Sequence, residues 1–391
     1  MGVPLSSFSG VIGQAGRVSP PDVAPVLSAR FRLAGHPLPM VSPARIYVCG
    51  ITPYDVTHLG HAATFVWADV AASVLRMAGV EVHSCRNVTD VDDVLTRAAG
   101  RSGRPYDEFA LTQEYLFEQD MRLLGVRRPA QEPRARNHIP HVVQLGLALQ
   151  QVGAAYERDG HLYFRGAVAV EGLDRVAALR LSAEYGDEPD DPLREDPFDV
   201  PVWRPSGEAD PAWPSPWGWG RPGWHAECAA MALAAFGPGI DLLVGGADLT
   251  FPHHAYQSAM AEAATAVTPF SRARLNVGTV AKNGAKMAKS TGNLTLVSDL
   301  VADHPPAAVR LLLLDRRWNT PWDFRVEDLA AAAGRLDRLY AAAGRPDSAP
   351  APVQAVSQAL LDDLDVPTAL DLAEHEGGAA ARHLIGVLSL G

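Results

Sequence analysis

The sequence contains no apolar run of the roughly 18 residues that a membrane-spanning helix needs, so no membrane span is expected. Its first residues lack a basic region followed by an apolar core, so no secretory signal is visible and a cytoplasmic protein is expected. Cysteine is scarce, with only Cys49, Cys85 and Cys228. An odd and sparse set argues against a disulfide framework, which leaves metal binding, catalysis or simple burial.

Positive charge is also in short supply. The 34 Lys and Arg residues face 45 Asp and Glu residues, and the net charge is −11. Nucleic-acid binding relies on clustered Lys and Arg, so this balance weighs against a large nucleic-acid surface but leaves a local basic patch open. The remaining composition, 47% hydrophobic and 20% charged, is that of a globular protein. A length of 391 residues predicts two or three domains.

The first predicted elements indicate an α/β fold. Residues 44–51 are typical of a buried strand, residues 57–79 of a helix that ends at Gly79, and residues 80–90 of a second strand with its turn. A strand, a helix and a strand of these lengths form a βαβ unit, so we expect a parallel sheet. Residues 1–30 have no clear periodicity and are expected to form a loosely ordered extension.

The later part of the chain alternates between helical and irregular patterns. Residues 104–158 are predicted to be helical, and residues 160–166 to form a strand. Residues 186–223 are rich in Pro, Gly, Asp and Trp and are expected to form a long irregular loop, a kind of segment that is usually functional or mobile. A helix is expected to begin near Trp224, and the chain from Pro306 onward is expected to be helical.

Two segments carry residues suited to phosphate. His58 and His61 flank a glycine at the predicted strand-to-helix turn, where imidazoles and helix N–H groups can bind phosphate oxygens. Lys282, Lys286 and Lys289 lie in a glycine-containing loop that suits a pyrophosphate leaving group. Taken alone, each segment is equally compatible with an ordinary solvated surface.

A third group consists of thiols and imidazoles: Cys49, Cys228, His225, His253 and His254. A catalytic zinc ion takes such ligands, with three protein groups and one open position. No Cys-x-x-Cys spacing is present, so buried cysteines and surface histidines are the simpler interpretation from these residues alone.

The motifs taken together resemble a known family. "HLGH" and "KMAKS" resemble the paired signatures of class I aminoacyl-tRNA synthetases. "YVCGITPYD", "NVTDVDD", "GRPGWHAECAAMA" and "GGADLTFPHH" are similar to the cysteine-specific branch, and within it most like the mycothiol cysteine ligases, which join cysteine to a glucosamine-inositol. The likeness extends from about residue 45 to about residue 328.

This resemblance implies a class I synthetase-type doubly wound parallel sheet, Rossmann-like, with an inserted connective segment. We expect the catalytic domain in residues 31–125 and 206–300, the insertion in residues 126–205, and a helical bundle in residues 301–391. Because the chain ends soon after that bundle, no anticodon-binding domain is expected.

The resemblance also implies roles for individual residues, with Zn²⁺, ATP and Mg²⁺ as cofactors or cosubstrates. They are as follows: metal ligands Cys49, Cys228 and His253; cysteine contacts Thr52 and Trp224; triphosphate contacts His58 and His61; adenosine contacts Gly245, Gly246 and Asp248; phosphate contacts Lys286 and Lys289.

Several positions separate the ligase branch from the synthetases. In cysteinyl-tRNA synthetases a Glu supplies a fourth metal ligand where this chain has Gln257. The motif "ITPYD" also resembles that of the ligases. Val94 and Ala288 depart from the usual ligase pattern and leave the acceptor open.

The sequence therefore predicts an enzyme that forms cysteinyl-adenylate and passes cysteine to the amine of glucosamine-inositol or a related small amine, without stable nucleic-acid binding. The alternatives are a truncated cysteinyl-tRNA synthetase and a non-catalytic binding protein. The joint presence of His58, His61, Lys286 and Lys289 argues against the latter. Monomer and homodimer both stay open.

Overall fold

The computed structural model describes residues 30–54, 57–208, 210–287, 292–347 and 350–391. The expected extension, apart from residue 30, lies outside the described residues, as do Lys289 and Ala288.

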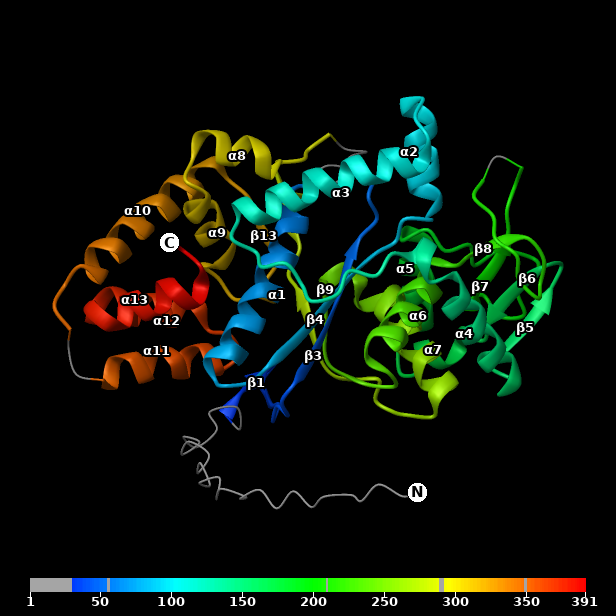
Figure 1. Ribbon diagram of the computed structural model, residues 1–391, viewed down its shortest axis with the longest axis horizontal. Coiled ribbons are helices and arrows are strands. Elements are labelled where there is room, and N and C mark those ends of the chain that lie inside the picture. Colours follow the sequence, from blue (N-terminus) through cyan, green and yellow to red (C-terminus); the bar gives the residue numbers. More distant parts are fainter. Residues whose placement is uncertain (1–29, 55–56, 209, 288–291, 348–349) are drawn as a thin grey trace, which may run out of the picture.

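A parallel sheet lies at the centre of the molecule (Figure 1). Its strands are β3 (Ala44–Ile51), β4 (Val82–Val88), β9 (Ile240–Gly246) and β10 (Ser271–Val277), in the order β10-β9-β3-β4. Every neighbouring pair is parallel, as the predicted βαβ unit requires. The strand order reverses beside β3, and ligands of doubly wound sheets bind at such a reversal, beyond the carboxyl ends of the strands.

Strand β3 sends alternate side chains to opposite faces of the sheet. Ile46 and Val48 belong to the apolar cluster that α1 (Leu59–Met77) forms on one face. Tyr47 and Cys49 belong to a separate cluster on the other face, which they share with Cys228 of α6 (Trp224–Phe236). This period-two alternation is what an extended chain dictates, and it places the Cys49 thiol on the side of α6.

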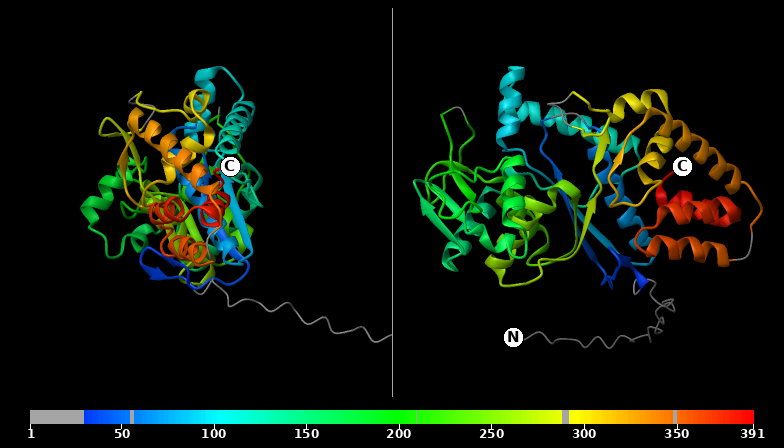
Figure 2. Two further views of the ribbon diagram at one scale, coloured as in Figure 1. Left: turned by 90° about the vertical axis from the view of Figure 1, so that its left-hand side faces the viewer. Right: turned by 180° about the vertical axis from the view of Figure 1, so that it is seen from behind.

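Helices from the carboxyl-terminal part of the chain cover the α1 side of the sheet, as both views along the short axis show (Figures 1 and 2). They are α8 (Val297–Asp303), α9 (Pro306–Leu314), α10 (Val326–Ala343), α11 (Ala351–Leu361), α12 (Val366–Glu376) and α13 (Gly378–Leu388). Their leucines and alanines join the same cluster as α1, so the expected carboxyl-terminal helices pack against α1 and one another.

A second, antiparallel sheet lies at the opposite end of the molecule (Figure 1). Its strands are β5 (Ala155–Arg158), β6 (His161–Phe164), β7 (Val200–Pro205) and β8 (Gly220–Pro222). Together with α4 (Ile139–Gln151) and α5 (Arg175–Glu184) it encloses an apolar cluster of its own, which includes Trp203 and Tyr256. The core of the molecule is thus built from separately packed parts.

Two sequence predictions fail in this region. The segment 186–223 is not irregular throughout, because it contains β7 and β8; prolines within β7 hide its alternation of apolar residues. The predicted helical stretch 104–158 holds α3 (Tyr106–Leu123) and α4, but its last residues form β5. Residues 155–158 pair with β6, and this long-range partner outweighs their local pattern.

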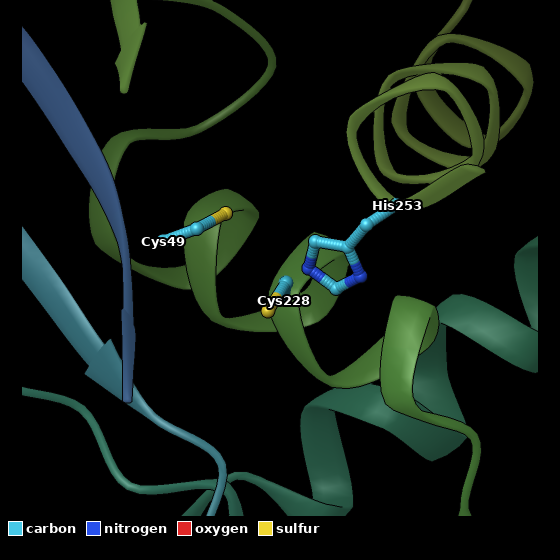
Figure 3. Close-up of side chains that lie close together, drawn as sticks. All are labelled: Cys49, Cys228 and His253. Carbon is cyan, nitrogen blue, oxygen red and sulfur yellow. The ribbon is translucent and has the colours of Figure 1, made fainter. Parts of the chain in front are cut away.

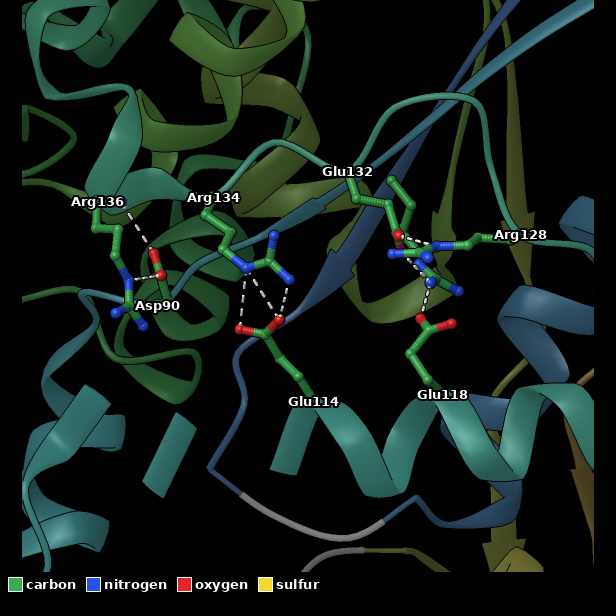
Figure 4. A network of polar contacts seen from close by, with 8 residues as sticks. Asp90, Glu114, Glu118, Arg128, Glu132, Arg134 and Arg136 are labelled. Carbon is green, nitrogen blue, oxygen red and sulfur yellow. Dashed lines mark hydrogen bonds and ion pairs between the residues drawn. The ribbon is translucent and has the colours of Figure 1, made fainter. Parts of the chain in front are cut away.

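An ion-pair network covers the free edge of β4 (Figure 4). Arg86 of β4 contacts Glu118 of α3 and Glu132 of the following segment, and Arg134 pairs with Glu114. Residues Gln131 and Arg134 also form parallel bridges to β4. The edge strand therefore has a partner, which keeps it from pairing with another chain.

The remaining described elements are short or connect the main ones. They are β1 (Arg32–Leu33), β2 (His36–Pro37), α2 (Asp93–Ser102), α7 (Ala255–Thr265), β11 (Val280–Lys282), β12 (Ala285–Lys286) and β13 (Trp322–Asp323). Among the residues that the structure describes, no helix combines the length and the apolar character needed to cross a membrane.

One buried guanidinium joins three parts of the α1 side. Arg310 of α9 contacts the Asp69 carboxylate of α1 at 2.6 Å, and it donates hydrogen bonds to the carbonyl oxygens of Leu124 and Leu388 at 2.7 and 2.6 Å. Its side chain is 1% exposed. Without Arg310 the two carbonyl oxygens would lose this donor, and among the described residues Asp69 would keep only Arg127, at 3.1 Å, as an ionic partner. Breaking a buried pair carries a larger penalty than breaking one at the surface.

We therefore expect Arg310→Met to lower the free energy of unfolding by about 3 kcal/mol or more. The control is Arg128→Met, since Arg128 is 73% exposed in its pair with Glu132 and such surface pairs contribute at most about 1 kcal/mol. Urea unfolding followed by far-ultraviolet circular dichroism measures both. Equal losses in the two variants would show that Arg310 does not join the helices as described.

Candidate functional site

A cavity of about 790 Å³ opens at the carboxyl ends of the central strands. It is lined by most of the residues that the sequence singled out, from segments far apart in the chain: Cys49, Thr52, His58, His61, Trp224, Gly246, Asp248 and Lys286. Its volume lies within the range of small-molecule sites in enzymes, about 300–1,000 Å³.

A thiol and imidazole cluster, whose three side chains Figure 3 shows, adjoins this cavity through Cys49; Cys228 and His253 do not line it. One ligand atom each from Cys49, Cys228 and His253 lie within 4.8 Å of one another, and all three residues are buried. Cys49 comes from the end of β3, Cys228 from α6, and His253 from the turn Thr250–His254 before α7. The three residues that the resemblance assigned to a metal are thus brought together by three different elements.

The cluster fits a zinc ion. Two sulfurs and one imidazole nitrogen are the donors of a catalytic zinc site that keeps an open position. The Nε2 atom of His253 is buried and has no hydrogen-bond partner among the described residues. An orphaned ring nitrogen beside two thiols is explained by a metal ligand role, because buried polar atoms otherwise find partners.

Neighbouring side chains hold these donors in place. Asn87 of β4 accepts from the Gly50 N–H at 2.9 Å and donates to the Cys228 sulfur at 3.2 Å, so one amide links β3 to α6. The Nδ1 atoms of His225 and His253 lie 2.9 Å apart, and the Trp224 ring stacks on His253 with centroids 4.0 Å apart. Residues that contact a metal ligand without binding the metal themselves fix the orientation of that ligand's ring.

The other two histidines of the sequence group are not part of the cluster. His225 contacts His253 through its Nδ1 atom, and its Nε2 lies 3.5 Å from the Asp187 carboxylate. His254 accepts a hydrogen bond from Asn276 at 3.1 Å and packs against Gly245, where an added Cβ would lie 2.6 Å from its ring. Composition alone did not separate these histidines from His253, but the resemblance did.

Gln257 occupies a buried position next to the cluster. Its Oε1 accepts from the Cys49 thiol at 3.3 Å, and its Nε2 donates to the Cys228 carbonyl oxygen at 3.5 Å. The side chain is fully enclosed. A neutral amide therefore stands where a carboxylate would add a negative charge.

His58 and His61 lie together at the start of α1, with ring centroids 4.0 Å apart. Burial, the neighbouring His61 and Lys286 lower the pKa of His58 from its usual 6.5 to about 3, so this imidazole is neutral at physiological pH. Its Nδ1 accepts a hydrogen bond from the Gly60 N–H at 3.1 Å, which leaves the proton on Nε2. His58 thus caps the helix and keeps one N–H donor for a ligand.

Lys286 and Asp248 form an ion pair that also lines the cavity. The Lys286 ammonium lies 2.6 Å from the Asp248 carboxylate and over the Tyr185 ring, 5.1 Å from its centroid. Burial lowers the pKa of Lys286, but Asp248 outweighs this and raises it. Lys286 is therefore a cation at neutral pH, as a phosphate contact requires. Lys289 lies outside the described residues, and Gly245 does not line the cavity.

Thr52 completes the predicted set. Its hydroxyl lies 2.6 Å from that of Thr89, and both follow the carboxyl ends of neighbouring strands. The cavity therefore joins a cluster that fits a metal, a hydroxyl pair, and cationic or N–H groups of the kind that can bind phosphate.

Sequence reasoning missed the outer wall of the cavity. It is formed by residues between β6 and β7, among them Tyr185, Asp187, Glu188, Asp191 and Arg194. The expectation that the segment from residue 186 onward is functional was the only available signal, and it pointed to no single residue.

Comparison with known proteins agrees with this geometry. The catalytic domain of class I tRNA synthetases of the (C) type matches residues 40–334. An L-cysteine:1D-myo-inositol 2-amino-2-deoxy-alpha-D-glucopyranoside ligase of Streptomyces griseus is 44% identical over 84% of this chain and 82% of its own. Ligases of the same name from Streptomyces avermitilis and Rhodococcus jostii are 42% and 41% identical. They align with 90% of this chain, over 90% and 89% of their own lengths. The chain belongs to the family of these cysteine ligases.

Solved structures with low sequence identity share the fold. Mycobacterium tuberculosis methionyl-tRNA synthetase in complex with methionyl-adenylate superimposes with a TM-score of 0.62 at 16% identity, over 85% of this chain and 82% of that one. A leucyl-tRNA synthetase from Agrobacterium radiobacter gives 0.63 at 11% identity, over 89% and 83%. The class I synthetase-type fold expected from the motifs is thereby confirmed.

The neutral, partly buried His58 predicts acid sensitivity. The unfolded chain binds a proton at this histidine near pH 6.5, whereas the folded protein does so only near pH 3. The unfolded state therefore gains stability as the pH falls below 6.5, by up to roughly 2 kcal/mol at pH 5.

We expect His58→Asn, which keeps a helix-capping side chain, to show a smaller loss of unfolding free energy between pH 7 and pH 5 than the wild type. Urea midpoints at the two pH values measure it. The control is His36→Asn, because His36 is exposed and lies outside the cavity. If His58→Asn is as acid-sensitive as the wild type, His58 is not the neutral group described above.

Proposed function

We propose that this protein is an ATP-dependent cysteine ligase that forms cysteinyl-adenylate and transfers the cysteinyl group to the amine of glucosamine-inositol. One observation carries this proposal: the cluster of Cys49, Cys228 and His253 adjoins the cavity that His58 and Lys286 line. A thiol-recognition site and a phosphate-binding site are thus close enough to serve one small substrate. The names of the related ligases support the same reaction.

Cys49, Cys228 and His253 would hold a zinc ion, with Gln257 left outside the ligand set. When bound, such a soft cation selects a substrate thiolate over the hydroxyl of serine, which is otherwise a close match in shape. Trp224 covers His253 and lines the cavity, so it would shield this end from water.

The other residues would position ATP. The Nε2–H of His58 and the Lys286 ammonium would contact its phosphates, with His61 beside them, and Mg²⁺ would accompany the nucleotide. Gly246 and Asp248 both line the cavity and would contact adenosine, and Gly246 approaches Asp248 so closely that an added Cβ would lie 2.3 Å from its carboxylate. Lys289 is proposed for the phosphates on the resemblance alone.

The reaction then takes two steps. The cysteine carboxylate attacks the α-phosphorus of ATP, the bond to pyrophosphate breaks, and cysteinyl-adenylate forms. The acceptor nitrogen next attacks the activated carbonyl, AMP leaves with the electron pair of its oxygen, and the nitrogen loses a proton. The residues above supply orientation and fixed charge, which are the main means of catalysis in such transfers.

Charging of tRNA is the alternative function. In the helical region, Arg335, Arg338 and Arg382 all form ion pairs with carboxylates. This pairing leaves less positive charge for an RNA backbone. Together with the net charge of −11, it favours a small acceptor.

The metal assignment predicts that Cys228→Ala loses zinc and that Cys85→Ala keeps it. The two cysteines are matched, because both are buried in the same apolar cluster, but only Cys228 belongs to the metal-binding group. Elemental analysis of purified protein measures zinc per chain. Equal zinc in Cys228→Ala and the wild type, or none in active wild-type protein, would refute the assignment.

The proposed reaction predicts cysteine-dependent ATP–pyrophosphate exchange without an acceptor, and no comparable exchange with serine. With glucosamine-inositol added, mass spectrometry should detect the cysteinyl amide and an equal amount of AMP. Total tRNA supplied instead should remain uncharged. Cysteine esterified to tRNA, with no amide from the sugar, would replace this proposal by the synthetase alternative.

A further inference from the structure

The outer wall of the cavity is formed by Tyr163 of β6 and by the segment between β6 and β7. Tyr163 ends in a hydroxyl that donates to the Asp191 carboxylate at 2.7 Å, and Arg194 lies over the Tyr163 ring, 6.0 Å from its centroid. None of the groups proposed above for cysteine, ATP or metal comes from this segment. The wall is thus available for a second substrate.

Arg194 is buried with fewer hydrogen-bond partners than its N–H donors can use. Its side chain is 4% exposed, and its Nε and Nη1 atoms have no hydrogen bond among the described residues. Its closest ionic neighbour is Asp191, at 3.6 Å. A buried guanidinium with open donors is costly in free energy, so a molecule in the cavity that accepts hydrogen bonds from it gains affinity.

Asp187 offers a carboxylate acceptor that complements the open donors of Arg194. Its Oδ2 atom is buried without a hydrogen-bond partner, while its Oδ1 lies 3.5 Å from Nε2 of His225. His225 in turn contacts the metal-binding residue His253. The unpartnered carboxylate oxygen therefore lies next to the end of the cavity where the cysteinyl group would sit.

These groups select for one ligand chemistry. A guanidinium and a carboxylate with open hydrogen-bonding atoms match hydroxyl groups, which both accept and donate. Asp187, Glu188 and Asp191 outnumber Arg194 on this wall. The excess negative charge favours an ammonium group and disfavours phosphate.

We propose that this wall is the acceptor subsite, and that Arg194 and Asp187 bind the hydroxyl groups of a polyhydroxylated amine. The inference rests on the proposed ligase function, because it assigns the second substrate of that reaction. Arg194 and Asp187 are acceptor-binding residues that orient the amine toward the activated carbonyl.

The test compares the wild type with Arg194→Met and Asp187→Asn. Calorimetry measures binding of glucosamine-inositol, and steady-state assays measure its KM and the kcat of amide formation. ATP–pyrophosphate exchange with cysteine alone and zinc content report on the rest of the site. Loss of hydrogen bonds to a charged group corresponds to about tenfold or more in affinity. We expect an increase of that size in Kd and KM for both variants, with exchange and zinc much less affected.

The control variant is Arg158→Met. The Arg158 guanidinium donates to the Leu193 carbonyl oxygen at 3.0 Å, so it supports the same segment without lining the cavity. It should leave the Kd and KM for the acceptor close to those of the wild type. Arg194→Lys, which keeps the charge but not the planar fork, should be intermediate.

Each outcome decides between the two proposals. Amide formation with a KM unchanged in Arg194→Met and Asp187→Asn would overturn the subsite and keep the ligase function. Binding of the amino sugar that both variants weaken, without amide formation, would support the subsite and reject the acceptor proposed for the reaction. No binding and no amide in the wild type would overturn both.

Discussion

The site depends on the alternation of side chains along β3. Because Ile46 and Val48 are buried under α1, Tyr47 and Cys49 must face α6. A slip of one residue would exchange the two faces and carry the Cys49 thiol away from Cys228. Gly50 strengthens this register, since an added Cβ there would lie 1.7 Å from the Asn87 carbonyl oxygen. The position of the proposed metal-binding cluster is thus determined by the packing of the sheet.

Two amide side chains are buried beside the carboxyl end of β3. Asn87 satisfies the Gly50 N–H and contacts the Cys228 sulfur, and Gln257 contacts both cysteine residues. These amides are uncharged, so neither adds a negative charge beside the two cysteines. Charged side chains line the cavity as well, among them the pair of Lys286 and Asp248 and the residues of the outer wall.

Local patterns in the sequence predicted the central elements well. β3 has the predicted bounds, 44–51, and α6 begins at the predicted Trp224, because each has one dominant period and a clear end. The antiparallel sheet was harder to predict, since β7 contains prolines and β5 acquires its form from β6. Among the histidines, only the resemblance distinguished His253 from His225 and His254. Arg194 and Asp187 were not predicted, because their role depends on a fold that brings a distant segment over the cavity.

The separate apolar clusters of the molecule have an evolutionary consequence. Residues on the activation side pack in the two clusters that flank the central sheet, which include Leu59 and Cys49, whereas the outer wall adjoins the cluster around Trp203. Mutations that reshape the wall therefore need not disturb the packing that holds His58 or Cys49. Such a chain can acquire a new acceptor while it continues to activate the same amino acid, so descendants of one ancestor can diversify their products without rebuilding their chemistry.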